Sequence, residues 1–216
     1  MFTGIITEIG TVKEIQPLGG GIRLCIDAAQ SSSDLHIHDS VSVNGVCLTV
    51  TSTDGSTFNV EAVEETLKKT TLASLHAGDC VNLELPVKLN GRLGGHVVLG
   101  HVDGVGTITH IQVNENSWMF SIRIPLVFMK YVVDTGSIAI DGVSLTVAER
   151  SEEEIRISII PHTWLNTVFQ YRKVGDVVNL EFDVIGKYLE RFLEREESLN
   201  EEKTFLAGRH LWELGF

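Results

Sequence analysis

The stretch Asn44–Val50 reads NGVCLTV, and a nearly identical stretch, DGVSLTV, returns at Asp141–Val147. The two copies lie 97 residues apart. A second pair with the same offset consists of Ala77–Glu84 (AGDCVNLE) and Val174–Glu181 (VGDVVNLE). Two motifs that keep one offset indicate a tandem repeat.

The repeat extends toward the start of the chain, where Gly4–Val12 (GIITEIGTV) matches Gly100–Ile108 (GHVDGVGTI) at an offset of 96 residues. Chance matches do not keep their register over roughly 80 residues, so we interpret the chain as a duplicated unit with a boundary near Gly94-Gly95. A unit of this length is too long for a solenoid repeat and fits a complete domain.

Short runs of alternating apolar and polar residues predict β-strands in each half. Examples are Ser40–Val43, Phe58–Glu61 and Val81–Glu84, and turn residues such as Thr53–Gly55 separate the runs. About six such strands per half, almost free of proline, favour a small closed barrel, because closure leaves no exposed strand edge. We therefore predict an all-β protein with two similar six-stranded antiparallel barrels, at residues 1–94 and 95–184.

The last part of the chain, residues 185–216, begins with a different pattern. Apolar residues recur at helical spacing with charged residues between them, which predicts one amphipathic helix. The apolar positions are Ile185, Tyr188, Leu189, Phe192 and Leu193. This stripe covers either a surface shared between barrels or chains, or only the end of the second barrel. The apolar segment Thr204–Trp212 either docks or frays.

Composition excludes several classes of function. The chain has 216 residues and a net charge of −12, with 17 basic side chains against 29 acidic ones, a surface that repels nucleic acid. The three cysteines, Cys25, Cys47 and Cys80, form no disulfide framework and no zinc motif, so we expect reduced thiols and a cytoplasmic protein. The start lacks a signal-peptide pattern, and no later stretch is apolar enough to predict a membrane span.

Cys47 and Ser144 occupy equivalent positions of the two repeats. A free cysteine in an apolar strand is most often a small buried residue. However, a thiol and a hydroxyl in otherwise matching phrases suggest two sites of one shape with different chemical duties, because the thiol becomes a nucleophile more easily.

His96 and His101 lie among glycines in Gly94–Gly104 (GGHVVLGHVDG). Their spacing puts them on opposite faces of a strand, so we expect no shared metal ion. Either could transfer protons near neutral pH or simply be hydrogen-bonded to a neighbouring carbonyl. Likewise, the paired phrases Glu65-Thr66 and His162-Thr163 form either the polar rim of a site or turn caps.

Several motifs in order resemble riboflavin synthase of the alpha-chain type across essentially the whole chain. These are MFTGI at Met1–Ile5, the paired NGVCLTV and DGVSLTV, the glycine-rich segment Gly94–Gly104, IPHT at Ile160–Thr163 and IGKYLERFL at Ile185–Leu193.

The resemblance implies two β-barrels, a homotrimer held together by the C-terminal helix, and active sites shared between neighbouring chains. The implied reaction is a dismutation without a cofactor, in which two molecules of 6,7-dimethyl-8-ribityllumazine exchange a four-carbon unit. The products are riboflavin and 5-amino-6-ribitylaminouracil. Association with a lumazine synthase shell is a further possibility that the resemblance raises.

The resemblance also implies the site residues. The catalytic candidates are Cys47, as the nucleophile or the residue that positions a water, and His101, Asp141 and Ser144 for proton transfer. Phe2 is expected to stack on or shield the substrate, and Ser40, Thr49 and Thr146 to meet the ribityl chain. The first pocket is expected to comprise Gly4, Ile5, Ile6, Cys47, Leu48, Thr49, Glu61, Ala62, Val63, Glu64, Glu65 and Thr66. The second is expected to comprise Gly100, His101, Val102, Thr135, Ser144, Leu145, Thr146, Ile159, Ile160, Pro161, His162, Thr163 and Trp164.

Two residues depart from the family pattern, Leu99 in place of serine and Thr135 in place of lysine. Both are expected in the second pocket, where the missing lysine removes a charge. These departures keep open an alternative, a non-catalytic lumazine protein. Retention of Cys47, Ser144, Asp141, His101 and the helix favours the enzyme.

Overall fold

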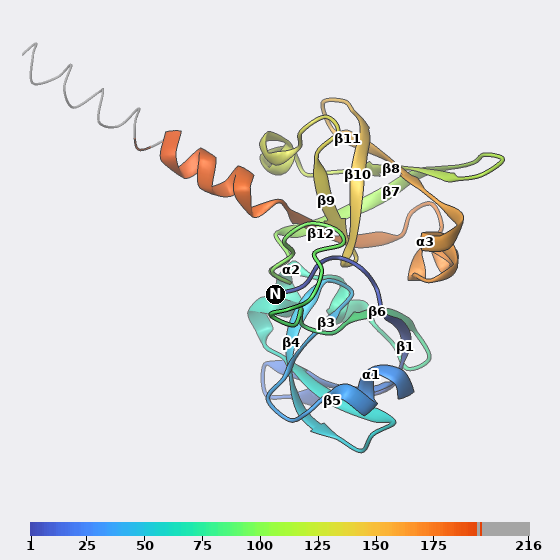
Figure 1. Ribbon diagram of the computed structural model, residues 1–216, viewed down its shortest axis with the longest axis vertical. Helices are drawn as coiled ribbons and strands as arrows, with labels where there is room; N and C mark the ends of the chain where they lie inside the picture. The colour runs from blue at the N-terminus through green and yellow to red at the C-terminus, as the bar shows by residue number, and fades with distance from the viewer. Residues whose placement is uncertain (194, 196–216) are drawn as a thin grey trace, which may run out of the picture. The chain divides into compact units, whose positions relative to one another are not determined.

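The computed structural model describes residues 1–193 and 195, and two closed six-stranded barrels lie within residues 1–183 (Figure 1). The first barrel follows the order β1 (Glu8–Leu18), β2 (Gly21–Asp27), β5 (Thr57–Ala62), β4 (Val46–Thr53), β3 (Ser40–Val43), β6 (Cys80–Glu84). The second follows the equivalent order β7 (Gly104–Val113), β8 (Trp118–Arg123), β11 (Glu154–Ile159), β10 (Val143–Arg150), β9 (Ser137–Ile140), β12 (Val177–Phe182). The predicted pair of antiparallel barrels is confirmed.

Short helices connect the strands. They are α1 (Ala29–Asp34), α2 (Glu64–Lys69), η1 (Thr71–Ser74), η2 (Leu126–Tyr131), α3 (Pro161–Leu165) and η3 (Val168–Tyr171). Thr70 and Thr167 cap η1 and η3 by accepting hydrogen bonds from the backbone N–H groups two residues later. The described helices therefore also follow the repeat, since α2 and η1 match α3 and η3.

The quoted stretch builds one hairpin of each barrel. Asn44-Gly45 joins β3 to β4 with positive φ at both residues, and Asp141-Gly142 does the same between β9 and β10. This is the geometry of two-residue hairpin turns, for which Asn-Gly and Asp-Gly are preferred. Past the turn, Val46, Leu48 and Val50 point into the barrel and are buried. The alternation that predicted the strand thereby also directs Cys47 outward.

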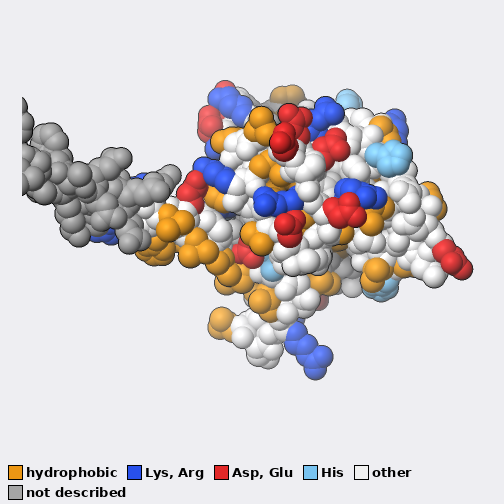
Figure 2. All heavy atoms as spheres, turned by 90° about the horizontal axis from the view of Figure 1, so that it is seen from above, with side chains coloured by type: hydrophobic (Ala, Val, Ile, Leu, Met, Phe, Trp, Pro, Cys, Tyr) orange, Lys and Arg blue, Asp and Glu red, His pale blue; other side chains and the backbone are white. Residues whose placement is uncertain are grey.

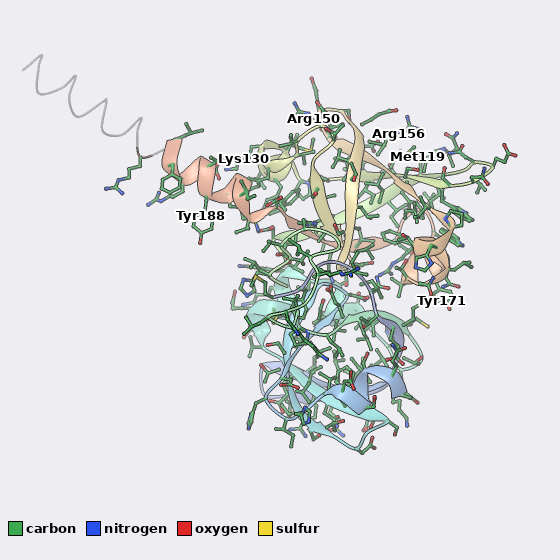
Figure 3. All side chains as sticks on the ribbon, viewed as in Figure 1. Met119, Lys130, Arg150, Arg156, Tyr171 and Tyr188 are labelled. Atoms are coloured by element: carbon green, nitrogen blue, oxygen red, sulfur yellow. The ribbon has the colours of Figure 1, made fainter. Side chains whose placement is uncertain are left out.

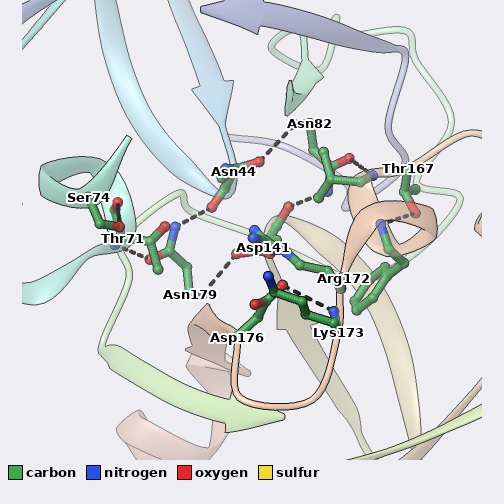
Figure 4. A network of polar contacts seen from close by, with 12 residues as sticks. Asn44, Thr71, Ser74, Asn82, Asp141, Thr167, Arg172, Lys173, Asp176 and Asn179 are labelled. Carbon is green, nitrogen blue, oxygen red and sulfur yellow. Dashed lines mark hydrogen bonds and ion pairs between the residues drawn. The ribbon is translucent and has the colours of Figure 1, made fainter. Parts of the chain in front are cut away.

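The two barrels contact each other through a reciprocal set of buried asparagine side chains (Figure 4). Asn82 donates from Nδ2 to the carbonyl of Asp141 (2.9 Å) and accepts from the Val168 N–H at Oδ1 (2.8 Å). Each of these bonds joins the first barrel to the second. A buried backbone group that had no partner would be costly, so these side chains fix how the barrels meet.

Asn179 repeats the arrangement in the opposite direction. Its Nδ2 donates to the carbonyl of Asn44 (2.8 Å), and its Oδ1 accepts from the Thr71 N–H (2.8 Å). The symmetry is broken at one point, because Asp141 also accepts from Arg172 (Nε 3.1 Å, Nη2 2.5 Å), whereas the equivalent Asn44 Nδ2 has no partner among the described residues.

Residues 184–193 form the predicted helix and belong to a separate compact unit, 184–216. Tyr188, Leu189, Phe192 and Leu193 are each more than half exposed, and Figure 3 shows Tyr188 projecting from this helix. The expectations for residues 194 and 196–216, including Thr204–Trp212, lie outside the described residues. No helix in the described part of the chain has the length and apolar character to cross a membrane.

Acidic and basic side chains are interspersed on the face shown in Figure 2, and apolar side chains gather along the helix beside the grey residues. Elsewhere on the surface as well as on this face, exposed charged side chains form ion pairs in the described part of the chain, and one example is Arg156 with Glu149 (2.7 Å). Exposed pairs of this kind contribute little to stability. The stability of the barrels therefore depends on their two apolar cores and on the contact between them.

We expect Asn179→Ala to lower the free energy of unfolding by about 2–4 kcal/mol, because it leaves the buried Thr71 N–H and Asn44 carbonyl without partners. Urea denaturation followed by circular dichroism measures the change. The control is Asn114→Ala in the exposed turn between β7 and β8, where an effect within about 0.5 kcal/mol is expected. Equal effects of the two substitutions would contradict the role given to Asn179.

Candidate functional site

Cys47 and Ser144 lie on the outer walls of the two barrels, both partly exposed. Cys47 stands opposite Ser42 of β3, and Ser144 stands opposite Ala139 of β9. Their strands continue the same outward face to Thr49 and Thr146. The structure thus places the two predicted reactive residues at equivalent positions of the two barrels.

A glycine covers each of these residues at very close range. The Cys47 N–H donates to the carbonyl of Gly100 (2.9 Å), and the Ser144 N–H donates to the carbonyl of Gly4 (2.8 Å). A Cβ built on Gly100 would lie 2.5 Å from the Cβ of Cys47, and one on Gly4 would lie 2.5 Å from the Cβ of Ser144. Both glycines also have φ near +77° (+78° and +76°). Only glycine satisfies both requirements.

These contacts correct the expected grouping of residues into pockets. Gly4, Ile5 and Ile6 were expected beside Cys47, but the Gly4 carbonyl accepts from the Ser144 N–H and Ile6 packs on the core of the second barrel, while Ile5 between them is exposed. Gly100, His101 and Val102 were expected beside Ser144, but Gly100 contacts Cys47 and Val102 packs on the core of the first barrel.

The reason for the crossing is a short antiparallel ladder between the barrels. Phe2 and Val98 exchange backbone hydrogen bonds (2.7 and 3.1 Å), and the His96 N–H donates to the Thr3 carbonyl (3.2 Å). We call residues 2–6 the first arm and residues 98–102 the second arm. Because the arms pair with each other at the boundary, each reaches the barrel opposite to the one it precedes in the sequence.

Most of the remaining expected pocket residues lie at the ends of β5 and β11. After Ala62 the chain turns into α2, which begins at Glu64, and after Ile159 it turns into α3, which begins at Pro161. Glu61, Val63, Glu64, Glu65, Ile160, Pro161 and His162 are exposed, and Thr66 and Thr163 are half-buried. Leu48, Ala62, Leu145 and Ile159 are buried in the barrel walls and support the site from behind.

Trp164 contributes to the barrel core. Its ring stacks on Trp118 with centroids 4.4 Å apart and lies 6.1 Å from Phe120. The two residues before it, His162 and Thr163, are exposed and half-buried, respectively. Trp164 therefore packs on the core of the second barrel, which the sequence pattern alone did not indicate.

A hollow of about 390 Å³ adjoins the first pocket. It lies between the turn Leu18–Gly21 and the residues Glu61–Glu64. The chain turns at Gly19-Gly20 between β1 and β2. A larger hollow, of about 460 Å³, is lined by residues of both barrels, including Thr71, Val168 and Arg172 of the asparagine network. Neither Cys47 nor Ser144 lines this hollow.

The polar side chains expected to meet the substrate lie on the outer faces. Ser40 stands directly opposite Thr49, and the partner of Thr146 is Ser137. Thr135 is exposed and adopts φ +60°, and its hydroxyl donates to the Asp134 carbonyl (2.6 Å). Its left-handed backbone matches that of His38 in the first repeat.

Phe2 is fully buried, so it does not lie open to a substrate as a stacking residue. It packs with Val98, Ala139 and Cys47 in a small apolar cluster between the barrels. Of the two roles expected for Phe2, the geometry is compatible with shielding, because the buried ring packs against Cys47.

His96 contacts a reactive residue, and the sequence reasoning did not place it in the site. Its Nδ1 lies 2.7 Å from Ser144 Oγ, and its side chain is largely buried. Burial lowers the pKa of His96, against the opposing effect of the Asp183 carboxylate. The ring is therefore neutral near pH 7, in a form that can accept a proton. The available signal was the glycine pair before His96, because Gly95 also lies against Ser144.

The other two proton-transfer candidates differ in placement. His101 is exposed beside Gly100. Asp141 is fully buried in the asparagine network, where it accepts from the Asn179 N–H (2.9 Å) and from Arg172. Its position indicates that it orients the strand that carries Ser144. Leu99, expected in the second pocket, lies next to Gly100 and hence on the Cys47 side, where its N–H donates to Glu181 (2.7 Å).

A family model described as "Lumazine binding domain" matches the chain twice, at residues 3–86 and 99–183. Among curated relatives, the riboflavin synthase of Actinobacillus pleuropneumoniae is 44% identical over 100% of both chains. That of Bacillus subtilis is 44% identical over 94% of each chain, and that of Schizosaccharomyces pombe is 42% identical over 90% of this chain and 94% of its own.

Solved structures of LumP share the arrangement. The complex with 6,7-dimethyl-8-(1'-D-ribityl) lumazine is 26% identical, with a TM-score of 0.77 over 84% of this chain and 99% of that one. The complex with riboflavin is 27% identical, with a TM-score of 0.79 over the same shares. The relatives with the higher sequence identity are the synthases.

Proposed function

The chain belongs to the riboflavin synthase family, and we propose that its two barrels hold the two substrate molecules of one reaction in different chemical roles. Its activity is that of a riboflavin synthase. A four-carbon unit passes from one 6,7-dimethyl-8-ribityllumazine to a second, giving riboflavin and 5-amino-6-ribitylaminouracil. The two products together contain all atoms of the two substrates, so the reaction consumes no oxidant or reductant.

The observation that carries the division of roles is the difference between Cys47 and Ser144 inside a symmetric frame. Cys47 packs with apolar side chains, including Phe2 and Val98, whereas Ser144 Oγ contacts the neutral ring of His96. We assign Cys47, or a water that it positions, to nucleophilic addition to the acceptor ring. We assign the Ser144–His96 pair to removal of a proton from the ring methyl of the donor.

Orientation supplies much of the expected rate. Two molecules held in fixed geometry react as if at very high concentration. The backbone of the two arms is well suited to this, because glycine close contacts leave little room for movement beside Cys47 and Ser144. The outward hydroxyls of Ser40, Thr49 and Thr146 are assigned to the ribityl chains.

A homotrimer is the oligomer that we propose. The supporting observation is the apolar stripe of the helix at residues 184–193, with Tyr188, Leu189, Phe192 and Leu193 more than half exposed. Exposed apolar area of this kind is typical of an interface. In this proposal the first barrel of one chain faces the second barrel of its neighbour, so that one active site uses both kinds of pocket. Association with a lumazine synthase shell would be a further layer of assembly.

We also propose that the protein acts in the cytoplasm. Cys25, Cys47 and Cys80 are all free, and the proposed role of Cys47 requires a reduced thiol. A reducing compartment maintains that state.

Incubation of the purified protein with 6,7-dimethyl-8-ribityllumazine should form one riboflavin for every two lumazine molecules consumed. Absorbance and fluorescence follow both compounds. The variant Cys47→Ser tests the role of the thiol, because it makes the first site chemically like the second. It should lower kcat at least tenfold while lumazine binding persists. Binding without riboflavin formation by the unaltered protein would instead indicate the function of a lumazine protein.

The pH dependence tests His96. Burial lowers its pKa below the usual value of about 6.5, so the ring stays neutral at pH 7 and gains a proton only at lower pH. We expect kcat/KM to fall as the pH decreases below about 6.5, because the protonated ring cannot accept a proton. His96→Gln should lower kcat at least tenfold and remove this acid limb. An unchanged acid limb in the variant would exclude His96 as the group responsible.

Sedimentation tests the trimer. The protein should sediment at three times the chain mass of 23.8 kDa. Leu189→Glu with Phe192→Glu should shift it to the mass of one chain and abolish turnover, because charge cannot be buried in an apolar interface. The control, Val113→Glu, changes an equally exposed apolar residue at the end of β7 and should leave both unchanged. A trimer that survives the double substitution would exclude this helix face.

A further inference from the structure

We propose that Glu84 and Glu181 are positioning residues, each of which holds one arm so that its glycine carbonyl meets the reactive residue of the other barrel. The inference rests on the proposed function in taking Cys47 and Ser144 as the reactive residues. It concerns the repeated motif VNLE, at Val81–Glu84 and Val178–Glu181. The proposed division of chemical roles gives its glutamates no part.

The two glutamates are 4% exposed, which is unusual for this residue type. Glu84, the last residue of β6, accepts at Oε1 from the Thr3 N–H (2.6 Å) and hydroxyl (2.7 Å), and at Oε2 from the Gly4 N–H (2.9 Å). A buried carboxylate requires several such partners. In this case they are successive groups of the first arm.

Glu181 of β12 makes the equivalent contacts with the second arm. Its Oε1 accepts from the Leu99 N–H (2.7 Å), and its Oε2 accepts from the Gly100 N–H (2.9 Å). Two consecutive backbone amides thus point toward one carboxylate in each half of the molecule.

The direction of the peptide groups carries the effect across the boundary. With its N–H on Glu181, Gly100 directs its carbonyl to the N–H of Cys47 (2.9 Å). With its N–H on Glu84, Gly4 directs its carbonyl to the N–H of Ser144 (2.8 Å). A carboxylate of the second barrel therefore orients the arm over Cys47, and one of the first barrel orients the arm over Ser144.

The repeated motif explains why both functions stay together. In VNLE the asparagine and the glutamate are two residues apart, so they lie on the same outward face of the strand. Asn82 and Asn179 fix the barrel contact, while Glu84 and Glu181 fix the arms that run along it.

A carboxylate is required because both facing groups are donors. Glutamine offers one acceptor oxygen, so Glu→Gln loses one of the hydrogen bonds. Its NH₂ group would also face a backbone N–H, and two donors that face each other cannot form a hydrogen bond. Aspartate keeps two acceptors but is one methylene shorter. Glutamine should release the arm most, and aspartate partly.

Alkylation of cysteines by iodoacetamide in the full-length protein, resolved by peptide mass spectrometry, tests the proposal. Because Gly100 packs on Cys47, Glu181→Gln should increase the rate at Cys47 at least tenfold, and Glu181→Asp should increase it less. Cys25 and Cys80 in the same molecule report general unfolding. Glu84→Gln should leave the rate at Cys47 unchanged.

The converse experiment uses the thiol introduced by Ser144→Cys. Its alkylation should accelerate in combination with Glu84→Gln and not with Glu181→Gln. Two results would overturn the proposal. If a glutamine variant or Glu181→Asp accelerated alkylation equally at all cysteines, the glutamates would hold the fold as a whole. If the assigned thiol were not accelerated, the glutamate would not hold its arm.

Turnover provides the second readout. Glu84→Gln and Glu181→Gln should each lower kcat at least tenfold, whereas Glu149→Gln, in the exposed pair with Arg156, should not. If the unaltered protein showed no turnover, the proposed function would be refuted. The alkylation rates would still test whether the glutamates hold the arms, because alkylation does not depend on catalysis.

Discussion

The hydrogen bonds of Asn82 and Asn179 to the backbone of the opposite barrel are the constraint on which the rest of the structure depends. Each amide satisfies one buried carbonyl and one buried N–H, so the barrels meet in a single register. That register brings the turns at Gly45 and Gly142 into contact and leaves just enough room for the arms. The environments of Cys47 and Ser144 follow from it.

The contact is symmetric in its backbone and asymmetric in its chemistry. Asp141 is paired with Arg172, whereas the equivalent Asn44 has an amide nitrogen without a partner among the described residues. Near the surface, Ser144 contacts His96, while Cys47 lies against Phe2. A reaction between two identical molecules requires this combination, because the same ring must be recognised twice and must react differently each time.

The sequence predicted the barrels well, because strand alternation and the repeat both act locally along the chain. The turn residues Asn44-Gly45 and Asp141-Gly142 and the helix at residues 184–193 are likewise local features. The crossing of the arms was missed, because it depends on contacts between residues about 100 positions apart, for which one sequence gives no signal. The contact of His96 with Ser144 and the buried position of Phe2 also depend on residues far apart in the sequence, and the glycine pair before His96 was the one local signal of its place.

The arms explain why two barrels are joined in one chain. Gly100 belongs to the second repeat but completes the wall beside Cys47 of the first, and Gly4 does the converse for Ser144. Separation of the barrels would remove from each the glycine that covers its reactive residue. Because the arms cross, each half constrains the other: the glutamate of one barrel holds the glycine that meets the reactive residue of the opposite barrel. The repeated phrases therefore remain alike where they build the contact, and they differ at Cys47 and Ser144, where the two substrate molecules need different treatment.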